Sequence, residues 1–286
     1  MTRFLLSISF LVASLAPNLV AQAPSPQAVD AAHGDGGGSA AARLADPLVG
    51  QRMDTFATED SGLRILVDIA LGGGNLEHNV SGSSLFSDDT SAGYLRFGFE
   101  VLGESGWGGG ARFEGLATDD DLFASTGGVP STNSDAEFFF HATKEFGGEQ
   151  FRMPVRFGLF LRGYEQEANA TGNTVTWSNV GPRLEMEPEF ALVHGASLRW
   201  SLFAQLGAEV GYTKIETDPS TDKYTSSMTA LDLTLGTRFQ FSAVELELGF
   251  RNRSLYFDRS DTVNAIAVPE IDIYERLLVI GLRLRF

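Results

Sequence analysis

The final stretch of the chain, YERLLVIGLRLRF, alternates apolar residues with charged or small ones at a period of two. Counting back from Phe286, the apolar positions are Leu284, Leu282, Ile280 and Leu278. Successive side chains of a β-strand point to opposite faces, so the pattern predicts a strand with one apolar and one polar face. In a soluble protein the apolar face would be covered by a core, whereas in a membrane-spanning barrel it would face lipid.

The N-terminus carries the pattern of an export signal. Arg3 precedes an apolar run at 4–15, and small residues follow around Ala21 and Ala23. This is the layout of a secretory signal peptide, and the run is shorter than the roughly 20 apolar residues that span a bilayer. We therefore predict that residues 1–23 are a signal peptide, with cleavage after Ala21 or Ala23.

Residues 24–60 differ from the rest of the chain. They are rich in Ala, Gly, Pro and Ser and show no periodicity, which predicts a flexible linker. The alternative is a plug or a partner-binding peptide that acts through Leu44, Leu48 and Val49.

Composition narrows the class of protein. The chain has no cysteine, so neither a disulfide framework nor a lipid-anchored N-terminal cysteine is available. Its formal charge of −16 disfavours nucleic acid as a partner, because a phosphate backbone selects for a basic surface. No later segment reads as a long apolar helix, so a membrane protein of this sequence must satisfy its backbone groups by closing a sheet.

Residues 61–286 contain ten strand-like runs separated by connections that are alternately short and long. We place the runs at 61–73, 91–103, 106–117, 134–147, 150–165, 174–191, 195–214, 226–241, 243–257 and 270–286. An even number of strands, with short turns on one side and long loops on the other, is typical of transmembrane β-barrels. The predicted fold is therefore all-β, an antiparallel transmembrane barrel of about ten strands. Pro182 and Pro188 lie inside the sixth run, and because proline removes ladder hydrogen bonds we expect that strand to be bulged or split.

The two faces of the runs differ in character. One face is apolar throughout, as in Leu63 to Leu71 and Val244 to Phe250, whereas the other carries both signs of charge. This is the reverse of a soluble barrel, and a two-sheet sandwich would have to hide the charged faces. Cross-strand ion pairs should therefore cross-link the interior wall. The predicted members are Arg152, Arg156, Glu187, Glu189, Glu245, Glu247, Arg283 and Arg285.

Aromatic residues gather at two predicted levels, as expected for rings at a water–lipid boundary. The level near the short turns would contain Trp107, Phe151, Trp200, Phe241 and Phe286. The level near the long loops would contain Trp177, Tyr212, Tyr256 and Tyr274.

The last run, with Leu278, Ile280, Leu282 and Leu284 leading to a terminal Phe286, resembles the C-terminal strand of Gram-negative outer-membrane β-barrel proteins. The resemblance covers residues 61–286 at the level of pattern. It implies an outer-membrane location, a periplasmic position for residues 24–60, and contact with outer-membrane lipid and lipopolysaccharide. It also implies that the barrel-assembly machinery reads the final strand during insertion. A count of ten departs from the eight strands usual in small barrels and matches omptin proteases and some adhesins.

The charged interior leaves two functional readings open. If the ion pairs are continuous, the barrel is closed, and its role is structural or one of surface recognition or adhesion carried by the loops. If gaps remain, the barrel is a narrow porin-like channel for small polar solutes.

An enzyme is the rival class. An omptin-like protease needs acidic residues and a histidine near the outer mouth, to activate a water molecule. The chain offers His78 in the predicted first long loop, with Asp88, Asp89 and Asp119 to Asp121 in neighbouring loops, but it has no matching Asp-His motif. The acidic loops also lack the spacing of a known calcium motif. We therefore predict no catalytic residues, no cofactor and no specific metal site.

Overall fold

The computed structural model describes residues 62–81, 87–118, 131–168, 171–195, 197–220, 222–264 and 266–286, with the backbone alone for Ser87 and Asp88. These residues belong to one compact unit, Met53–Phe286. The predicted signal peptide (1–23) and linker (24–60) lie outside the described residues. The strands are β1 (Arg64–Val80), β2 (Ser87–Leu102), β3 (Trp107–Thr118), β4 (Ser131–Gly147), β5 (Phe151–Ala168), β6 (Asn173–Met186), β7 (Glu189–His194), β8 (Arg199–Asp218), β9 (Lys223–Phe241), β10 (Val244–Phe257) and β11 (Ile271–Arg285).

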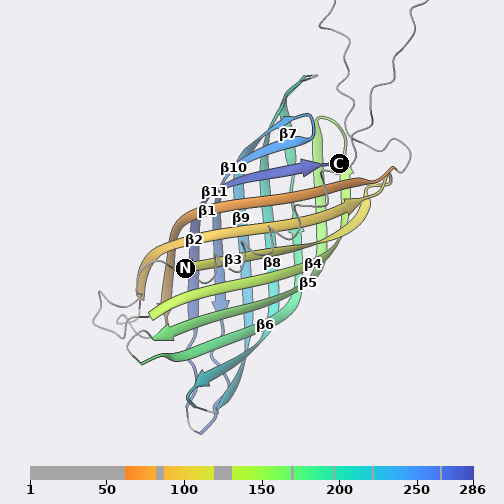
Figure 1. The fold of residues 1–286 in the computed structure, drawn as a ribbon. Helices are drawn as coiled ribbons and strands as arrows, with labels where there is room; N and C mark the ends of the chain where they lie inside the picture. The colour runs from red at the N-terminus through yellow and green to blue at the C-terminus, as the bar shows by residue number, and fades with distance from the viewer. Residues whose placement is uncertain are drawn as a thin grey trace, which may run out of the picture. The chain divides into compact units, whose positions relative to one another are not determined.

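The strands form one closed antiparallel sheet, which confirms the predicted fold class. Neighbours in the chain pair with each other around the barrel, and β1 pairs with β11 to close it (Figure 1). Phe286 extends this seam, because its amide and carbonyl both bond Ile65 at 2.9 Å. None of the described residues forms a helix long and apolar enough to cross a membrane.

β6 and β7 are two parts of the sixth strand of a ten-stranded barrel, because both pair with β5 and β8. The break falls at Glu187 and Pro188. The Glu187 amide donates to the Pro154 carbonyl and the Ala204 amide donates to the Pro188 carbonyl, each at 3.0 Å. In both pairs the return bond is missing because proline has no amide hydrogen. The split therefore occurs at Pro188, one of the two prolines named from the sequence, together with Pro154 of β5, whereas Pro182 stays within the β5–β6 ladder.

The strands at the long-loop end extend further than the sequence indicated. Residues 74–90 were expected to be a loop, but β1 continues to Val80 and β2 begins at Ser87. His78 consequently lies on β1, with its side chain buried, and that part of the prediction is wrong. Short turns join the strands at the other end, at 103–106, 148–150 and 242–243, and only a few residues separate the end of β7 at His194 from the start of β8 at Arg199.

The outward face of the barrel carries a belt of exposed apolar side chains near the short-turn end. Leu71 and Ile280 are 62% and 61% exposed, and neighbouring strands repeat the pattern. Aromatic residues predicted for this end, including Trp107 and Phe286, are exposed as well. Beyond the belt the outward positions become polar, as in Asn75 and Glu77 on β1.

The polarity of the inward face changes along the barrel in the opposite direction. It is charged behind the apolar belt and becomes apolar towards the long loops, where Leu76, Trp177 and Ile215 belong to the main buried cluster. Trp177 was expected in an outward aromatic girdle, and that prediction is wrong, because its side chain points inward and is 2% exposed. At the short-turn end the barrel therefore has apolar side chains outside and charged ones inside, the reverse of a soluble barrel. At the long-loop end it has the arrangement of a soluble barrel, with apolar side chains inside and polar ones outside.

Candidate functional site

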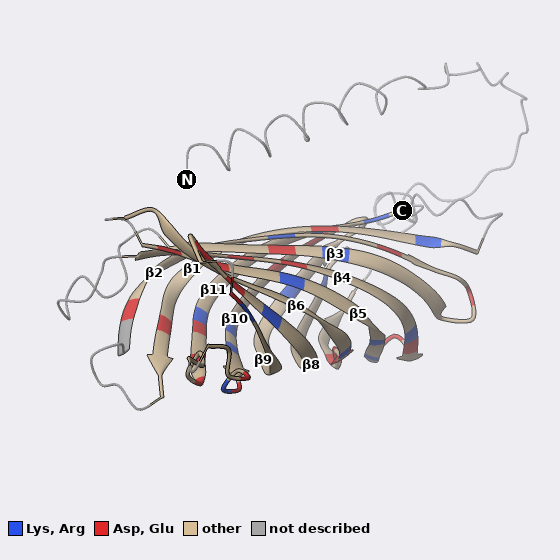
Figure 2. Ribbon diagram, turned by 90° about the horizontal axis from the view of Figure 1, so that it is seen from below, with Lys and Arg blue, Asp and Glu red and all other residues tan. Residues whose placement is uncertain are grey.

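An ion-pair network lies in the lumen behind the apolar belt. Positions of both charges recur along most strands (Figure 2). Among the described residues, every arginine of the network contacts at least one carboxylate within 4.0 Å. The twelve arginines are Arg96, Arg112, Arg152, Arg156, Arg162, Arg183, Arg199, Arg238, Arg251, Arg253, Arg283 and Arg285. The twelve carboxylates that they bind are Asp68, Glu100, Glu114, Asp135, Glu137, Glu185, Glu187, Glu189, Glu209, Asp232, Glu245 and Glu247. Charge within the network is therefore balanced.

The layer nearest the short turns brings together several of the residues that the sequence analysis named for the interior ion pairs. Arg283 lies opposite Glu245 in the β10–β11 ladder at 3.1 Å, and Arg285 also bonds Glu245. Arg152 donates to both oxygens of Glu189 at 2.7 Å. Alternation along each strand places all of these side chains on the inner wall.

Other predicted members have partners that the sequence did not indicate. Glu247 lies opposite Gly281, and instead of Arg283 or Arg285 it accepts hydrogen bonds from Arg238 at 2.7 Å and Arg96 at 3.1 Å. Glu187 accepts one from Arg156 at 2.7 Å and another from Arg238. These contacts run across the lumen and not only between adjacent strands.

Glu185 is the centre of the middle layer. Its side chain is fully buried and accepts hydrogen bonds from Arg112 at 3.0 and 2.5 Å, from Arg156 at 3.0 Å and from Arg183 at 3.0 Å. Such bidentate pairs fix guanidinium planes more firmly than point contacts do. The middle layer consequently ties strands β3, β5 and β6 together.

Aromatic rings stack against arginine side chains of the network. The Arg238 guanidinium lies 3.8 Å from the centroid of the Phe203 ring. Phe203 has room because Gly236 and Gly249 face each other in the β9–β10 ladder, and a Cβ on Gly236 would come within 2.6 Å of the ring. Stacking on a ring stabilises a desolvated guanidinium.

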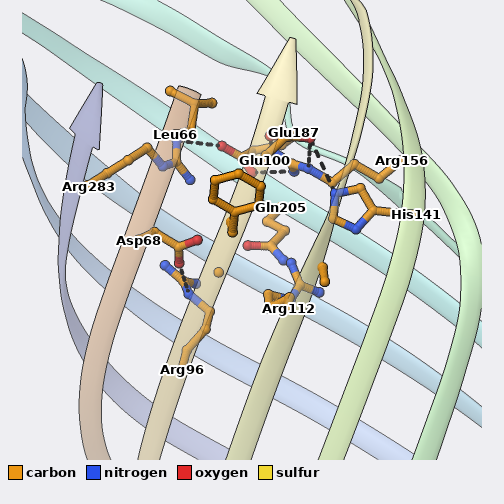
Figure 3. Close-up of a pocket in the computed structure, with 13 residues that line it drawn as sticks. Leu66, Asp68, Arg96, Glu100, Arg112, His141, Arg156, Glu187, Gln205 and Arg283 are labelled. Carbon is orange, nitrogen blue, oxygen red and sulfur yellow. Dashed lines mark hydrogen bonds and ion pairs between the residues drawn. The ribbon is translucent and has the colours of Figure 1, made fainter. Parts of the chain in front are cut away.

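A small polar cavity lies within the network, around Glu100 (Figure 3). Arg156 donates to both Glu100 oxygens at 3.1 and 3.2 Å, Thr143 donates to one of them, and His141 Nε2 lies 3.3 Å away. The cavity volume is about 30 Å³, which is room for a few water molecules at most.

A cluster of buried apolar side chains, the apolar plug, lies inside the barrel at the long-loop end. We use this name for the buried side chains Leu76, Tyr164, Trp177, Ile215, Tyr224, Phe257, Ile271 and Ile273. The rings of Tyr164 and Trp177 pack at 5.2 Å, and the Tyr164 hydroxyl donates to Asn133 at 2.6 Å. The His78 ring stacks on Tyr164 at 6.5 Å.

The sequence reading missed the plug, although a signal for it exists. In β1 the alternating apolar residues occupy odd positions from Ile65 to Leu71, with Leu66 and Ala70 as exceptions, whereas Leu76 and Val80 lie at even positions. In β8 they occupy even positions from Trp200 to Tyr212, with Phe203 as the exception, whereas Ile215 lies at an odd position. A change of apolar parity within one uninterrupted strand indicates that the core has moved to the other face.

Metal and cofactor sites do not emerge from the described residues. No group of three or more histidine, aspartate or glutamate side chains in the described ranges is arranged to hold a metal ion. Two hollows, of about 410 and 530 Å³, are open apolar grooves on the outward belt, one over β6 and β8 to β10 and the other over β8 to β11. They lie where lipid chains would cover the barrel.

Comparisons with known proteins return only structural likenesses. No protein-family model matches the chain, and no curated protein does. Solved structures similar to the chain include the outer membrane protease OmpT from Escherichia coli, with 10% identity, a TM-score of 0.34, and coverage of 80% of this chain and 98% of that one. Another is Ail, the attachment invasion locus protein of Yersinia pestis, with 11% identity, a TM-score of 0.31, and 78% and 99% coverage.

Neisserial surface protein A is a third likeness, with 13% identity, a TM-score of 0.28, and coverage of 79% of this chain and 98% of that one. At these values no activity or ligand is carried over to the chain. The class follows instead from the chain's own geometry, in which a closed antiparallel sheet turns an apolar belt outward and ion pairs inward. The chain therefore has the fold of a membrane-spanning β-barrel, with its apolar belt placed to face lipid.

Proposed function

We propose that this protein is a closed surface barrel, with a structural or recognition role carried by its extracellular end. The observation that supports this most directly is a double seal. The ion-pair network fills the lumen at membrane level, and the apolar plug fills it above. About eight strands already leave an interior that side chains just fill, so a ten-stranded barrel needs such filling to be closed.

The extracellular end includes an ordered segment suited to recognition. Residues 258–264 fold back on β9, where the Asp261 amide donates to the Thr225 carbonyl at 3.0 Å and the Thr225 amide donates to Asp261 Oδ1 at 2.7 Å. Ile266 is 59% exposed at the tip. A fixed loop with an exposed apolar tip loses little conformational freedom on binding.

The charge of this end indicates the kind of surface it could recognise. Its exposed or half-exposed carboxylates are Asp218, Asp222, Asp258, Asp261, Glu270 and Asp272, and the cations near them are Lys214, Lys223 and Arg259. Lys214 and Lys223 hydrogen-bond Glu216 and lower the pKa of its carboxyl. We therefore expect a positively charged partner surface in preference to a polyanion.

A protease role has less support from the described residues. His78 is buried in the plug, His141 faces Glu100 in the lumen, and His194 lies at a periplasmic turn 3.7 Å from Glu149. None of the three faces the outer surface beside a described carboxylate. Asp119 to Asp121 lie outside the described residues, and the side chain of Asp88 does too.

Conductance in planar bilayers tests the closed barrel. The purified mature chain should produce no steady ion current, because both seals would have to open. Steady currents would establish the narrow channel instead. Incubation of the same sample with a mixed peptide library should leave the peptides intact, and cleavage would establish an enzyme.

Adherence of whole cells tests the recognition role. Cells that display the protein should adhere to polylysine-coated beads more than to heparin-coated beads, and replacement of residues 259–268 by a Gly-Ser linker should abolish the difference. A matched replacement of the periplasmic turn at 242–243 should not. Equal adherence before and after the loop replacement would contradict a recognition role for this loop.

A further inference from the structure

Glu275 is a buried carboxylate that the ion-pair network does not include. It lies on β11, faces inward and is 2% exposed. In the ladders it stands opposite Leu76 of β1 and Arg253 of β10. Its position is therefore the boundary between the network and the apolar plug.

The arginine opposite Glu275 is engaged elsewhere. Arg253 Nη2 donates to Glu137 and Glu209, each at 2.5 Å, and its Nη1 lies 3.6 Å from Glu114. Among the described residues Glu275 makes no hydrogen bond and no ion pair. Because the network already balances twelve arginines with twelve carboxylates, an ionised Glu275 would be a thirteenth, uncompensated charge. An unpaired buried charge costs several kcal/mol, and such a group becomes neutral instead.

The surroundings limit how that charge could be neutralised. Glu275 lines a cavity of about 10 Å³ with Tyr94, Glu114, Asp135, Glu137, Arg251 and Arg253. Asp135 Oδ1 is buried there without a hydrogen-bond donor. The cavity is at the lower limit for one water molecule, and the described side chains offer no group arranged to hold a metal ion. A proton is the one neutralising ligand that needs no further space.

We propose that Glu275 binds a proton at neutral pH, so that the boundary between network and plug is a proton-binding site. The groups that face it carry charge of both signs. They are the six titratable side chains named above that line the cavity, with Arg162 and Asp232 in the layer behind them. On β1 the inward neighbours are Leu76 and, two residues further out, His78. The proposal does not depend on the recognition role.

Infrared spectroscopy of the full mature chain in detergent tests the proton directly. At neutral pH the wild-type spectrum should contain the carbonyl band of a protonated carboxylic acid, and the Glu275→Gln spectrum should lack it. The exposed control Glu149→Gln should keep the band. Absence of the band from the folded wild-type protein at neutral pH would overturn the proposal, even if the Glu275→Gln variant does not fold.

The pH dependence of unfolding gives a second test. The unfolded chain releases this proton above about pH 4.3, whereas the folded barrel retains it, so the folded state binds more protons and the wild-type protein loses stability as pH rises. The urea midpoint of Glu275→Gln should therefore rise relative to that of wild type between about pH 5 and about pH 8. The Glu149→Gln midpoint should follow wild type. A parallel loss in wild type and Glu275→Gln would overturn the proposal, and so would a wild-type midpoint at neutral pH that depends on sodium rather than choline as the cation.

Discussion

Arg112 on β3 reaches across the lumen to Glu185 on β6 and holds its carboxylate through two hydrogen bonds, of 3.0 and 2.5 Å. Arg156 and Arg183 bind the same carboxylate, so one buried glutamate joins three arginines. Removal of any one of these four charges would leave its buried partners without full compensation.

Glu185→Gln should therefore destabilise the barrel strongly. The substitution leaves three guanidinium groups short of one negative charge, and loss of one partner of a buried pair costs about 3–5 kcal/mol. The free energy of unfolding in urea, measured in lipid vesicles, checks this. Glu149→Gln, at a side chain that is 87% exposed, is the control and should change stability by less than about 0.5 kcal/mol. Equal stability of both variants would contradict a structural role for the network.

The polarity reversal along β1 predicts that two positions on the same outward face respond differently to charge. Ile69→Arg places a guanidinium in the apolar belt, where a charge costs about 2–4 kcal/mol at the bilayer midplane. Asn75→Arg, six residues along the same face, places it in the polar zone at a cost of about 0–1 kcal/mol. Folding yield into vesicles should fall for Ile69→Arg alone. A similar loss for both would place Asn75 inside the hydrocarbon layer.

The alternation of apolar residues was enough to predict the barrel, because a period of two assigns each side chain to a face without knowledge of the fold. It also placed Glu245 and Arg283 at the same depth, because both lie close to the short-turn ends of the two strands, and they are opposite each other in the ladder. It could not predict the Arg112–Glu185 contact. The two residues are 73 positions apart and meet only through the diameter of the closed barrel.

The errors of the sequence-based prediction at the long-loop end have a different cause. We predicted strands that are too short at this end, because the outward-facing side chains beyond Leu71 and Tyr212 are no longer apolar. The same change of parity moved Trp177 from the expected girdle to the core. The unpaired state of Glu275 was not predictable either, because it depends on how Arg253 divides its donors among other carboxylates.

The break between β6 and β7 predicts a local effect of Pro188→Ala. An alanine would supply the amide hydrogen that the Ala204 carbonyl lacks, and one such bond contributes about 0.5–1.5 kcal/mol. The gain is offset by about 0.4–1 kcal/mol, because the unfolded chain becomes more flexible without the proline. Overall stability should therefore stay nearly unchanged, while hydrogen exchange at residues 187–189 should slow. Unaltered exchange at these amides would show that the break has another cause.

The C-terminal residue offers a test of the predicted assembly signal, Leu278, Ile280, Leu282, Leu284 and Phe286. Phe286 and Phe241 are each 47% exposed at the periplasmic end, so truncating either ring removes similar contact with lipid. If the assembly machinery reads the terminal aromatic, Phe286→Ala should lower the amount of folded barrel in the outer membrane of growing cells, and Phe241→Ala should not. Refolding of both purified variants into vesicles, where no machinery is present, should give equal yields. Equal loss in cells for the two variants would assign Phe286 a role in packing alone.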